Sequence, residues 1–195
     1  HYCPPGAAYR TGAMNILFLD NTVLAMRVMY TLIICLAGSM TYAFVTRYAG
    51  AAVGGLAAIL YVFSPYVAHV IPHTLGDLPG MMVLALYPML LWGLHRLLTV
   101  HRAFDFMGVA LTGAMFALVK PETIPVALGI ASLFIIWHIW DGRRKLRVFL
   151  VIFAGIFAAG LAAFYWIPAL LDESLVRWVE APFTPLPYEL TLSGL

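Results

Sequence analysis

Arg27 is the first polar group of this chain whose type and position could support chemistry. It follows Asp20 by seven residues, so the two side chains can share one helix face. A guanidinium binds phosphate oxygens bidentately, and Arg27 could therefore anchor a lipid phosphate. The alternative is an arginine that snorkels to the membrane interface or forms a local ion pair. The sequence leaves both interpretations open.

His69, His73 and Asp77 form the second group, and each lies four positions after the one before it. On one face of a regular helix, two histidines and an acid at this spacing could bind a divalent metal ion. Two prolines and a glycine in the same stretch disfavour a regular helix. The alternative is an outer loop with hydrogen-bonding histidines. A divalent metal is therefore a possible cofactor, but no firm set of ligands is predicted.

Lys120 and Glu122 form the third group, in a stretch with two prolines that interrupts an apolar run. Non-helical backbone near a membrane is tolerated only where protein or water satisfies its polar groups. The break is either a tight outer turn between two short spans or a turn below the membrane surface that lines a cavity. This turn is the leading candidate for a site.

Asp172 and Glu173 form the last group, and they follow the aromatic sequence Phe164-Tyr165-Trp166-Ile167-Pro168. Aromatic residues at the end of a span form an interfacial belt, and proline ends the helix, so no function is needed to explain them. The predicted substrate-binding residues are Arg27, Asp77, Lys120 and Glu122. The weaker candidates are His69, His73, Asp172 and Glu173.

The composition identifies the environment in which these groups must act. Of the 195 residues, 63% are hydrophobic and 10% are charged, whereas soluble domains are about 45–50% apolar and about 25% charged. These figures exclude a soluble globule, a disordered chain and a coiled coil, and they predict a membrane protein. The net charge of +2 without a basic stripe predicts no nucleic-acid partner. Cys3 and Cys35 make neither a disulfide framework nor a metal knuckle.

Apolar runs of about 18 residues predict membrane-spanning helices. The fold class is therefore an all-α polytopic bundle of about six spanning helices, preceded by an interfacial or re-entrant helix over 6–19. Residues 1–170 form the transmembrane domain, and 171–195 begin an extracytoplasmic segment. Small residues over 50–55 and 155–160 predict close helix packing. The six predicted spans are 23–45, 50–71, 79–100, 106–119, 124–140 and 148–170.

The distribution of charge predicts the orientation of these spans, because basic residues favour the cytoplasmic side. Seven basic residues lie on one side and four on or near the other, whereas seven of the nine acids lie on the second side. This pattern predicts a protein of the cytoplasmic membrane whose tail is extracytoplasmic. The basic residues assigned to the cytoplasm are Arg47, Arg96, Arg102, Arg143, Arg144, Lys145 and Arg147.

Several short motifs together resemble a known family. The chain resembles the prokaryotic proteins named "membrane protein, 6-pyruvoyl-tetrahydropterin synthase-related", which belong among the GT-C-type glycosyltransferases. The resemblance implies transfer of a sugar from a polyprenyl-phosphate donor to an acceptor on the outer face. It implies no pterin chemistry, because no soluble pterin-synthase domain fits this composition. The motifs are Tyr2-Cys3-Pro4-Pro5, Leu60-Tyr61-Val62-Phe63-Ser64-Pro65-Tyr66, Thr74-Leu75-Gly76-Asp77, Leu86-Tyr87-Pro88-Met89-Leu90 and Phe164-Tyr165-Trp166-Ile167-Pro168-Ala169-Leu170.

The resemblance also bears on single residues. The catalytic acid of such enzymes usually lies in the first outer loop, before the stretch that matches Tyr2-Cys3-Pro4-Pro5. It is therefore expected upstream of this chain, which we interpret as an internal fragment. Asp77 falls where the family tends to have an acid. At 120–123 the family often has a polar break with histidine, where this chain has Lys120 and Glu122.

The leading functional hypothesis is thus a GT-C-like glycosyltransferase whose partners are membrane lipids and a lipid-phosphate sugar donor. Arg27 or Lys120 would stabilise the leaving phosphate, and the four substrate-binding candidates should converge on one outer cavity. The alternative is a multi-pass transporter or flippase-like carrier, which would favour broken helices near the midplane and an inverted repeat. A purely structural membrane subunit is a third hypothesis. The oligomeric state is left open.

Overall fold

The computed structural model describes residues 22–69, 77–100, 102–140 and 145–172. All secondary-structure elements in these ranges are helices, as predicted. The predicted helix over 6–19, the tail beyond Asp172, and the candidates His73 and Glu173 lie outside the described residues.

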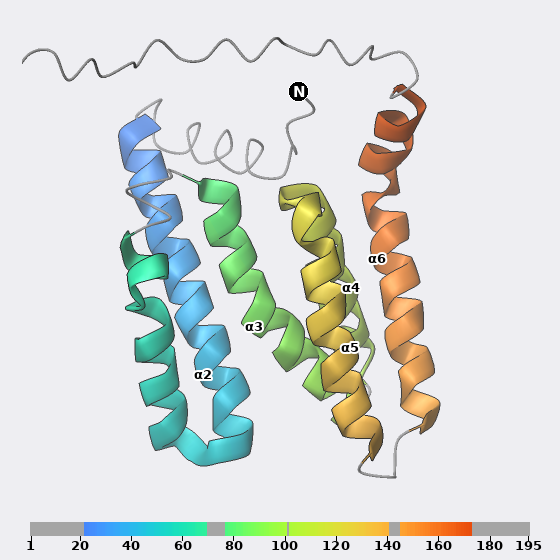
Figure 1. Ribbon diagram of the computed structural model, residues 1–195, viewed down its shortest axis with the longest axis horizontal. Helices are drawn as coiled ribbons and strands as arrows, with labels where there is room; N and C mark the ends of the chain where they lie inside the picture. The colour runs from blue at the N-terminus through green and yellow to red at the C-terminus, as the bar shows by residue number, and fades with distance from the viewer. Residues whose placement is uncertain (1–21, 70–76, 101, 141–144, 173–195) are drawn as a thin grey trace, which may run out of the picture.

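Helix α2 (Thr22–Val62) is a helical hairpin whose two legs meet at Gly50 (Figure 1). Gly50 has a φ of 82°, a left-handed conformation that side chains other than glycine rarely adopt. The two legs correspond to the first two predicted spans. The regular helix ends at Val62 and a further helical turn follows over 65–69, whereas the last two residues of the second predicted span lie outside the described residues. At the end of the regular helix the Ser64 hydroxyl donates to the Tyr61 carbonyl at 3.0 Å, and Pro65 has no N–H to continue the ladder.

Helix α3 (Leu78–Thr99) matches the predicted span over 79–100 and contains Pro88 in its interior. A proline cannot donate to the carbonyl four residues earlier, which here belongs to Leu84. The Tyr61 hydroxyl of α2 donates to that carbonyl at 2.7 Å. A side chain from the neighbouring helix therefore satisfies the backbone group that the proline leaves open.

The remaining elements are α4 (Ala103–Val119), the 3₁₀ turn η2 (Pro121–Thr123), α5 (Ile124–Trp140) and α6 (Lys145–Asp172). The predicted helix over 124–140 coincides with α5, and the one over 148–170 lies within α6. The predicted start of α4 was three residues late, because Asp105 was interpreted as loop. It lies instead in the first turn of the helix, where the positive end of the helix dipole favours an acid.

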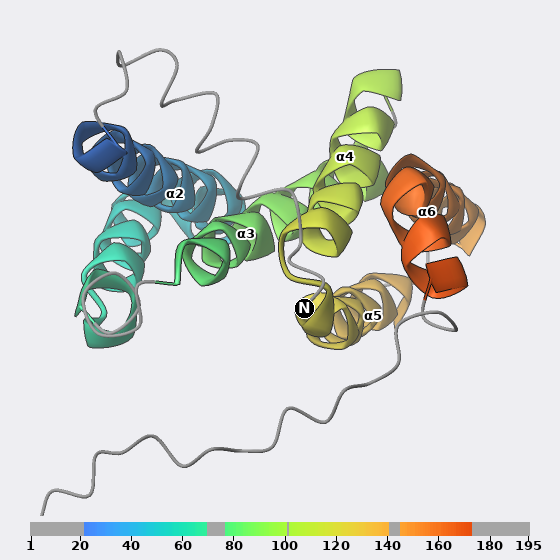
Figure 2. The same ribbon diagram turned by 90° about the horizontal axis from the view of Figure 1, so that it is seen from above.

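Helix α3 forms the centre of the bundle, with α2 packed on one side and α4 on the other (Figure 2). Helix α6 packs along α4, whereas α5 makes fewer backbone contacts with its neighbours. We call the end where α3 and α5 begin the upper end, because it is uppermost in Figure 1; the opposite end is the lower end. The fully buried side chains of the core include Met81, Leu94, Leu97, Leu98 and Val119.

The outward faces of the helices are strongly apolar. Phe104, Phe63 and Leu133 are 78%, 74% and 70% exposed. A water-soluble bundle would not leave so many large apolar side chains uncovered on every side, whereas lipid is the natural environment for them. Four helical stretches of the described residues are long and apolar enough to cross a membrane, and α4 is apolar but shorter. The chain is therefore a helical membrane protein.

Candidate functional site

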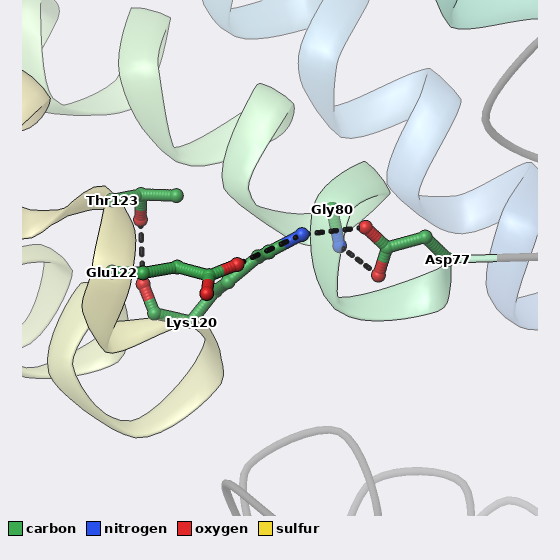
Figure 3. Close-up of polar contacts among 5 residues, drawn as sticks. All are labelled: Asp77, Gly80, Lys120, Glu122 and Thr123. Carbon is green, nitrogen blue, oxygen red and sulfur yellow. Dashed lines mark hydrogen bonds and ion pairs between the residues drawn. The ribbon is translucent and has the colours of Figure 1, made fainter. Parts of the chain in front are cut away.

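Asp77, Lys120 and Glu122 meet at the upper end of the bundle, and we call them the upper charged cluster (Figure 3). The Lys120 ammonium donates to Asp77 Oδ2 at 2.7 Å and lies 3.3 Å from Glu122 Oε1. Asp77 precedes α3, whereas Lys120 and Glu122 belong to the break between α4 and α5. The contact therefore joins segments 43 residues apart in sequence.

The Asp77 carboxylate is held by the start of α3. It is the N-cap of that helix, and its Oδ1 accepts the Gly80 N–H at 2.9 Å. Pro79 occupies the first turn, where its missing N–H costs no helical hydrogen bond. One carboxylate oxygen thus caps the helix while the other pairs with Lys120. Capping and pairing together fix the orientation of Asp77.

Lys120 ends α4 and begins the break that the sequence predicts. Its backbone N–H donates to the Phe116 carbonyl, and its own carbonyl accepts the Thr123 hydroxyl at 2.6 Å. The break is a tight turn, in which the backbone N–H and the hydroxyl of Thr123 both donate to the Lys120 carbonyl. The geometry directs the Lys120 side chain away from η2 and across to α3 (Figure 3).

The electrostatics of the upper charged cluster keep its central pair ionised. Burial opposes ionisation of Asp77, but the hydrogen bonds from Lys120 and from the Gly80 N–H outweigh it and hold the pKa of the carboxyl below its ordinary value of 3.8. The hydrogen bond to Asp77 is the main cause that raises the pKa of Lys120 above 10.5. Two carboxylates face one ammonium, so the cluster carries a net negative charge.

An apolar groove of about 710 Å³ lies between α4, α5 and α6. It exists because α5 does not pack closely along α6. Small residues such as Gly113, Gly155 and Ala158 line the groove, and Ser132 supplies its one hydroxyl side chain among the described residues. Its lining extends to Ile124, the residue directly after η2. The groove therefore reaches the turn that carries the upper charged cluster.

The other predicted candidates do not join this cluster among the described residues. Arg27 is exposed on α2, and the structure records no ion pair between its side chain and another described residue. Its predicted neighbour Asp20 lies outside the described ranges. All four predicted substrate-binding residues were expected to converge on one cavity. Three of them, Asp77, Lys120 and Glu122, meet in the structure, and Arg27 does not join them. Asp172 ends α6 at the same upper end, and its side chain lies outside the described part.

The possible divalent-metal site at His69, His73 and Asp77 gains no support from the geometry of the described residues. His69 is exposed, and His73 lies outside the described ranges. Both oxygens of Asp77 are already engaged, by an ammonium and by a backbone N–H. Within the described ranges, no three histidine, cysteine, aspartate or glutamate side chains gather as metal ligands would.

A second polar cluster, at the lower end, was missed as a site. Arg96 Nε lies 2.7 Å from Asp105 Oδ1, and the Asp105 side chain is only 2% exposed. The guanidinium of Arg96 also lies 4.9 Å from the centre of the Trp92 ring. These residues served only to predict the topology. A basic residue in the last turn of one helix and an acid in the first turn of the next, across a short loop, could have signalled this pair.

No family model, curated protein or solved structure matches the chain. The functional inference therefore depends on the residues of the site itself.

Proposed function

We propose that the chain forms part of a membrane glycosyltransferase of the GT-C type, which takes its sugar from a polyprenyl-phosphate donor at the outer face. One observation supports this proposal above the others: the upper charged cluster lies where the apolar groove between α4, α5 and α6 ends. A polyprenyl-phosphate sugar matches this arrangement, because it has a long apolar tail and a charged head that is rich in hydroxyl groups. The short motifs that resemble the GT-C proteins favour the same donor.

The groove accounts for the tail of this donor. Its lining is almost wholly aliphatic and aromatic, and it includes Phe116 and Trp166 near the upper end. Small residues along α6 leave room for a flexible chain without moving the helix backbone. A prenyl chain in this groove would leave its phosphate at the level of η2, close to Lys120.

The upper charged cluster accounts for the head of the donor. Glu122 has the longer contact with Lys120, and its side chain is 72% exposed, so it can release the ammonium to a phosphate oxygen. Asp77 stays in place because it also caps α3. Glu122 is then free to accept hydrogen bonds from sugar or acceptor hydroxyls. No described residue is assigned as the base that removes the proton from the acceptor hydroxyl.

The reaction would be a direct displacement. The acceptor oxygen forms a bond to the anomeric carbon while the bond from that carbon to the phosphate oxygen breaks, and a general base takes the hydroxyl proton. Cations stabilise the phosphate as it leaves. In the proposed orientation the upper end is extracytoplasmic, because the basic residues of the chain concentrate at the lower end.

Binding of undecaprenyl phosphate to the full-length protein in detergent tests the proposal, with native mass spectrometry as the readout. Lys120→Met should weaken binding about tenfold, since it removes a charge-assisted hydrogen bond to phosphate. Arg27→Met is the matched control, because it removes an exposed cation that does not belong to the cluster. If both variants lost lipid binding equally, the result would contradict the assignment of Lys120 as the phosphate-binding residue.

The groove is tested separately with two glycines of α6. Gly155 lines the groove, Gly160 does not, and an added Cβ meets no atom within 4 Å at either position. Gly155→Leu should weaken binding of the long-chain lipid, whereas Gly160→Leu should not. If the protein binds the polyprenyl-phosphate sugar but transfers no sugar to any acceptor, the result would instead support the alternative hypothesis of a transporter or flippase-like carrier.

A further inference from the structure

The lower end of the bundle contains a small cavity that the proposed glycosyl transfer does not use. Its volume is about 210 Å³. It lies between the lower part of α2, the last turn of α3 and the residues that lead into α4, on the side of the bundle opposite the upper charged cluster. The residues that line it are Arg47, His95, Arg96, Thr99, Val100 and Arg102.

The charge of this cavity is unbalanced. Three guanidinium groups contribute to its lining, and the one carboxylate that pairs with any of them among the described residues is Asp105, which contacts Arg96. Arg47 and Arg102 have no ion pair with another residue of the described ranges. Two positive charges are therefore left without a counter-charge from that part of the chain.

Part of the cavity wall, at Arg96 and His95, is also held in a fixed conformation. Asp105 and the Trp92 ring restrain the Arg96 guanidinium. The Tyr48 hydroxyl lies 2.8 Å from His95 Nδ1 and restrains the imidazole. Groups restrained in this way lose little conformational freedom when a ligand binds. Arginines that served only to orient the helices in the membrane would need neither a cavity nor such restraint.

We infer that this cavity binds a phosphate group. Guanidinium forks match phosphate oxygens in geometry as well as charge, and arginine is the preferred side chain for that contact. Pockets for drug-sized ligands are about 300–1,000 Å³, so this cavity suits a single small anionic group better than a whole nucleotide. The phosphate can come from the headgroup of a lipid in the adjacent leaflet or from a soluble ion.

Two variants test the inference without disturbing the buried pair: Arg47→Gln and Arg102→Gln. Both arginines are exposed, so their loss should leave the fold intact, which thermal unfolding followed by circular dichroism would verify. Arg147→Gln is the matched control, because it removes the same charge from the first turn of α6 at the same end of the bundle.

In the lipid arm, native mass spectrometry of the full-length protein counts bound phosphatidylglycerol against phosphatidylcholine. In the soluble arm, inorganic phosphate is titrated in neutral detergent and followed by phosphorus NMR line width. Selective binding of either probe, weakened about tenfold by Arg47→Gln or Arg102→Gln but not by Arg147→Gln, supports the inference and identifies the source of the phosphate. Equal losses in all three variants, or binding of neither probe, would overturn it.

Discussion

The hydroxyl of Tyr61 supplies the hydrogen bond that Pro88 cannot give inside α3. Pro88 leaves the Leu84 carbonyl without its helical donor, and Tyr61 supplies a donor from α2 at 2.7 Å. A buried carbonyl without a partner costs about 1–3 kcal/mol, and more in an apolar environment. The hydroxyl therefore stabilises both the helix and its packing against α2.

Tyr61→Phe should consequently lower the free energy of unfolding by about 1–3 kcal/mol. In a Pro88→Ala background the same change should cost much less, because the introduced alanine could donate its own backbone N–H to the Leu84 carbonyl. Unfolding of the four proteins of this double-mutant cycle in detergent measures the coupling. An equal cost of Tyr61→Phe in both backgrounds would show that the hydroxyl acts independently of the proline.

Asp77 has two separable roles, capping α3 and pairing with Lys120. Asp77→Asn keeps an oxygen that can accept the Gly80 N–H but removes the charge, whereas Asp77→Ala removes both. The half-exposed ion pair should contribute less than about 1 kcal/mol, and the cap about 1 kcal/mol more. The temperature of thermal unfolding should therefore be highest for the wild type, lower for Asp77→Asn and lowest for Asp77→Ala.

The pair also predicts a pH dependence. The lowered pKa of Asp77 gives stability that is complete above 3.8 and is lost as the pH falls through the folded value. The raised pKa of Lys120 gives stability that is complete below 10.5 and is lost as the pH rises through the folded value. The difference in stability between the wild type and Asp77→Asn should thus be constant near neutral pH and shrink at both extremes. A difference that changed near neutral pH would point to another group.

At the scale of the elements, the α2 hairpin depends on one backbone conformation. Gly50 and Gly55 both have open space where a Cβ would lie, but only Gly50 has a positive φ. Gly50→Ala should therefore cost about 1 kcal/mol, since an L residue is strained in the left-handed region. Gly55→Ala should be neutral or slightly stabilising, because alanine favours a helix.

Unfolding measurements on these two glycine variants isolate the strain at the bend, since steric contact is absent at both positions. If Gly55→Ala lowered the free energy of unfolding as much as Gly50→Ala, the left-handed conformation at Gly50 would not be the cause of the loss.

At the scale of the whole molecule, the proposed orientation places position 174 outside the cytoplasmic membrane and position 144 inside. Single cysteines, introduced as Ser174→Cys and Arg144→Cys in a protein without Cys3 and Cys35, test it. In intact cells, a thiol reagent that cannot cross the membrane should label position 174 and leave position 144 unmodified. Labelling of position 144 alone would reverse the orientation and move the upper charged cluster to the cytoplasmic side.

The sequence by itself determined the environment and most of the helices. An apolar run of sufficient length must be helical in lipid, because each backbone group needs a partner within its own segment. This local rule predicted α3, α5 and α6 closely, and it located the polar break at Lys120. It missed the role of Asp77 as an N-cap, although an acid shortly before Pro79 was a usable signal.

Only the tertiary structure decided which polar groups meet. Asp77 pairs with Lys120 across 43 residues, whereas Arg27, which was also a predicted substrate-binding residue, has no ion pair with another described residue. The buried Arg96–Asp105 pair and the contact from Tyr61 to Leu84 were likewise decided by packing. The physical reason is that helices in lipid are apolar on nearly every face. Hydropathy therefore indicates which helices are long and apolar enough to cross a membrane, but the direction in which their few polar groups point depends on their neighbours.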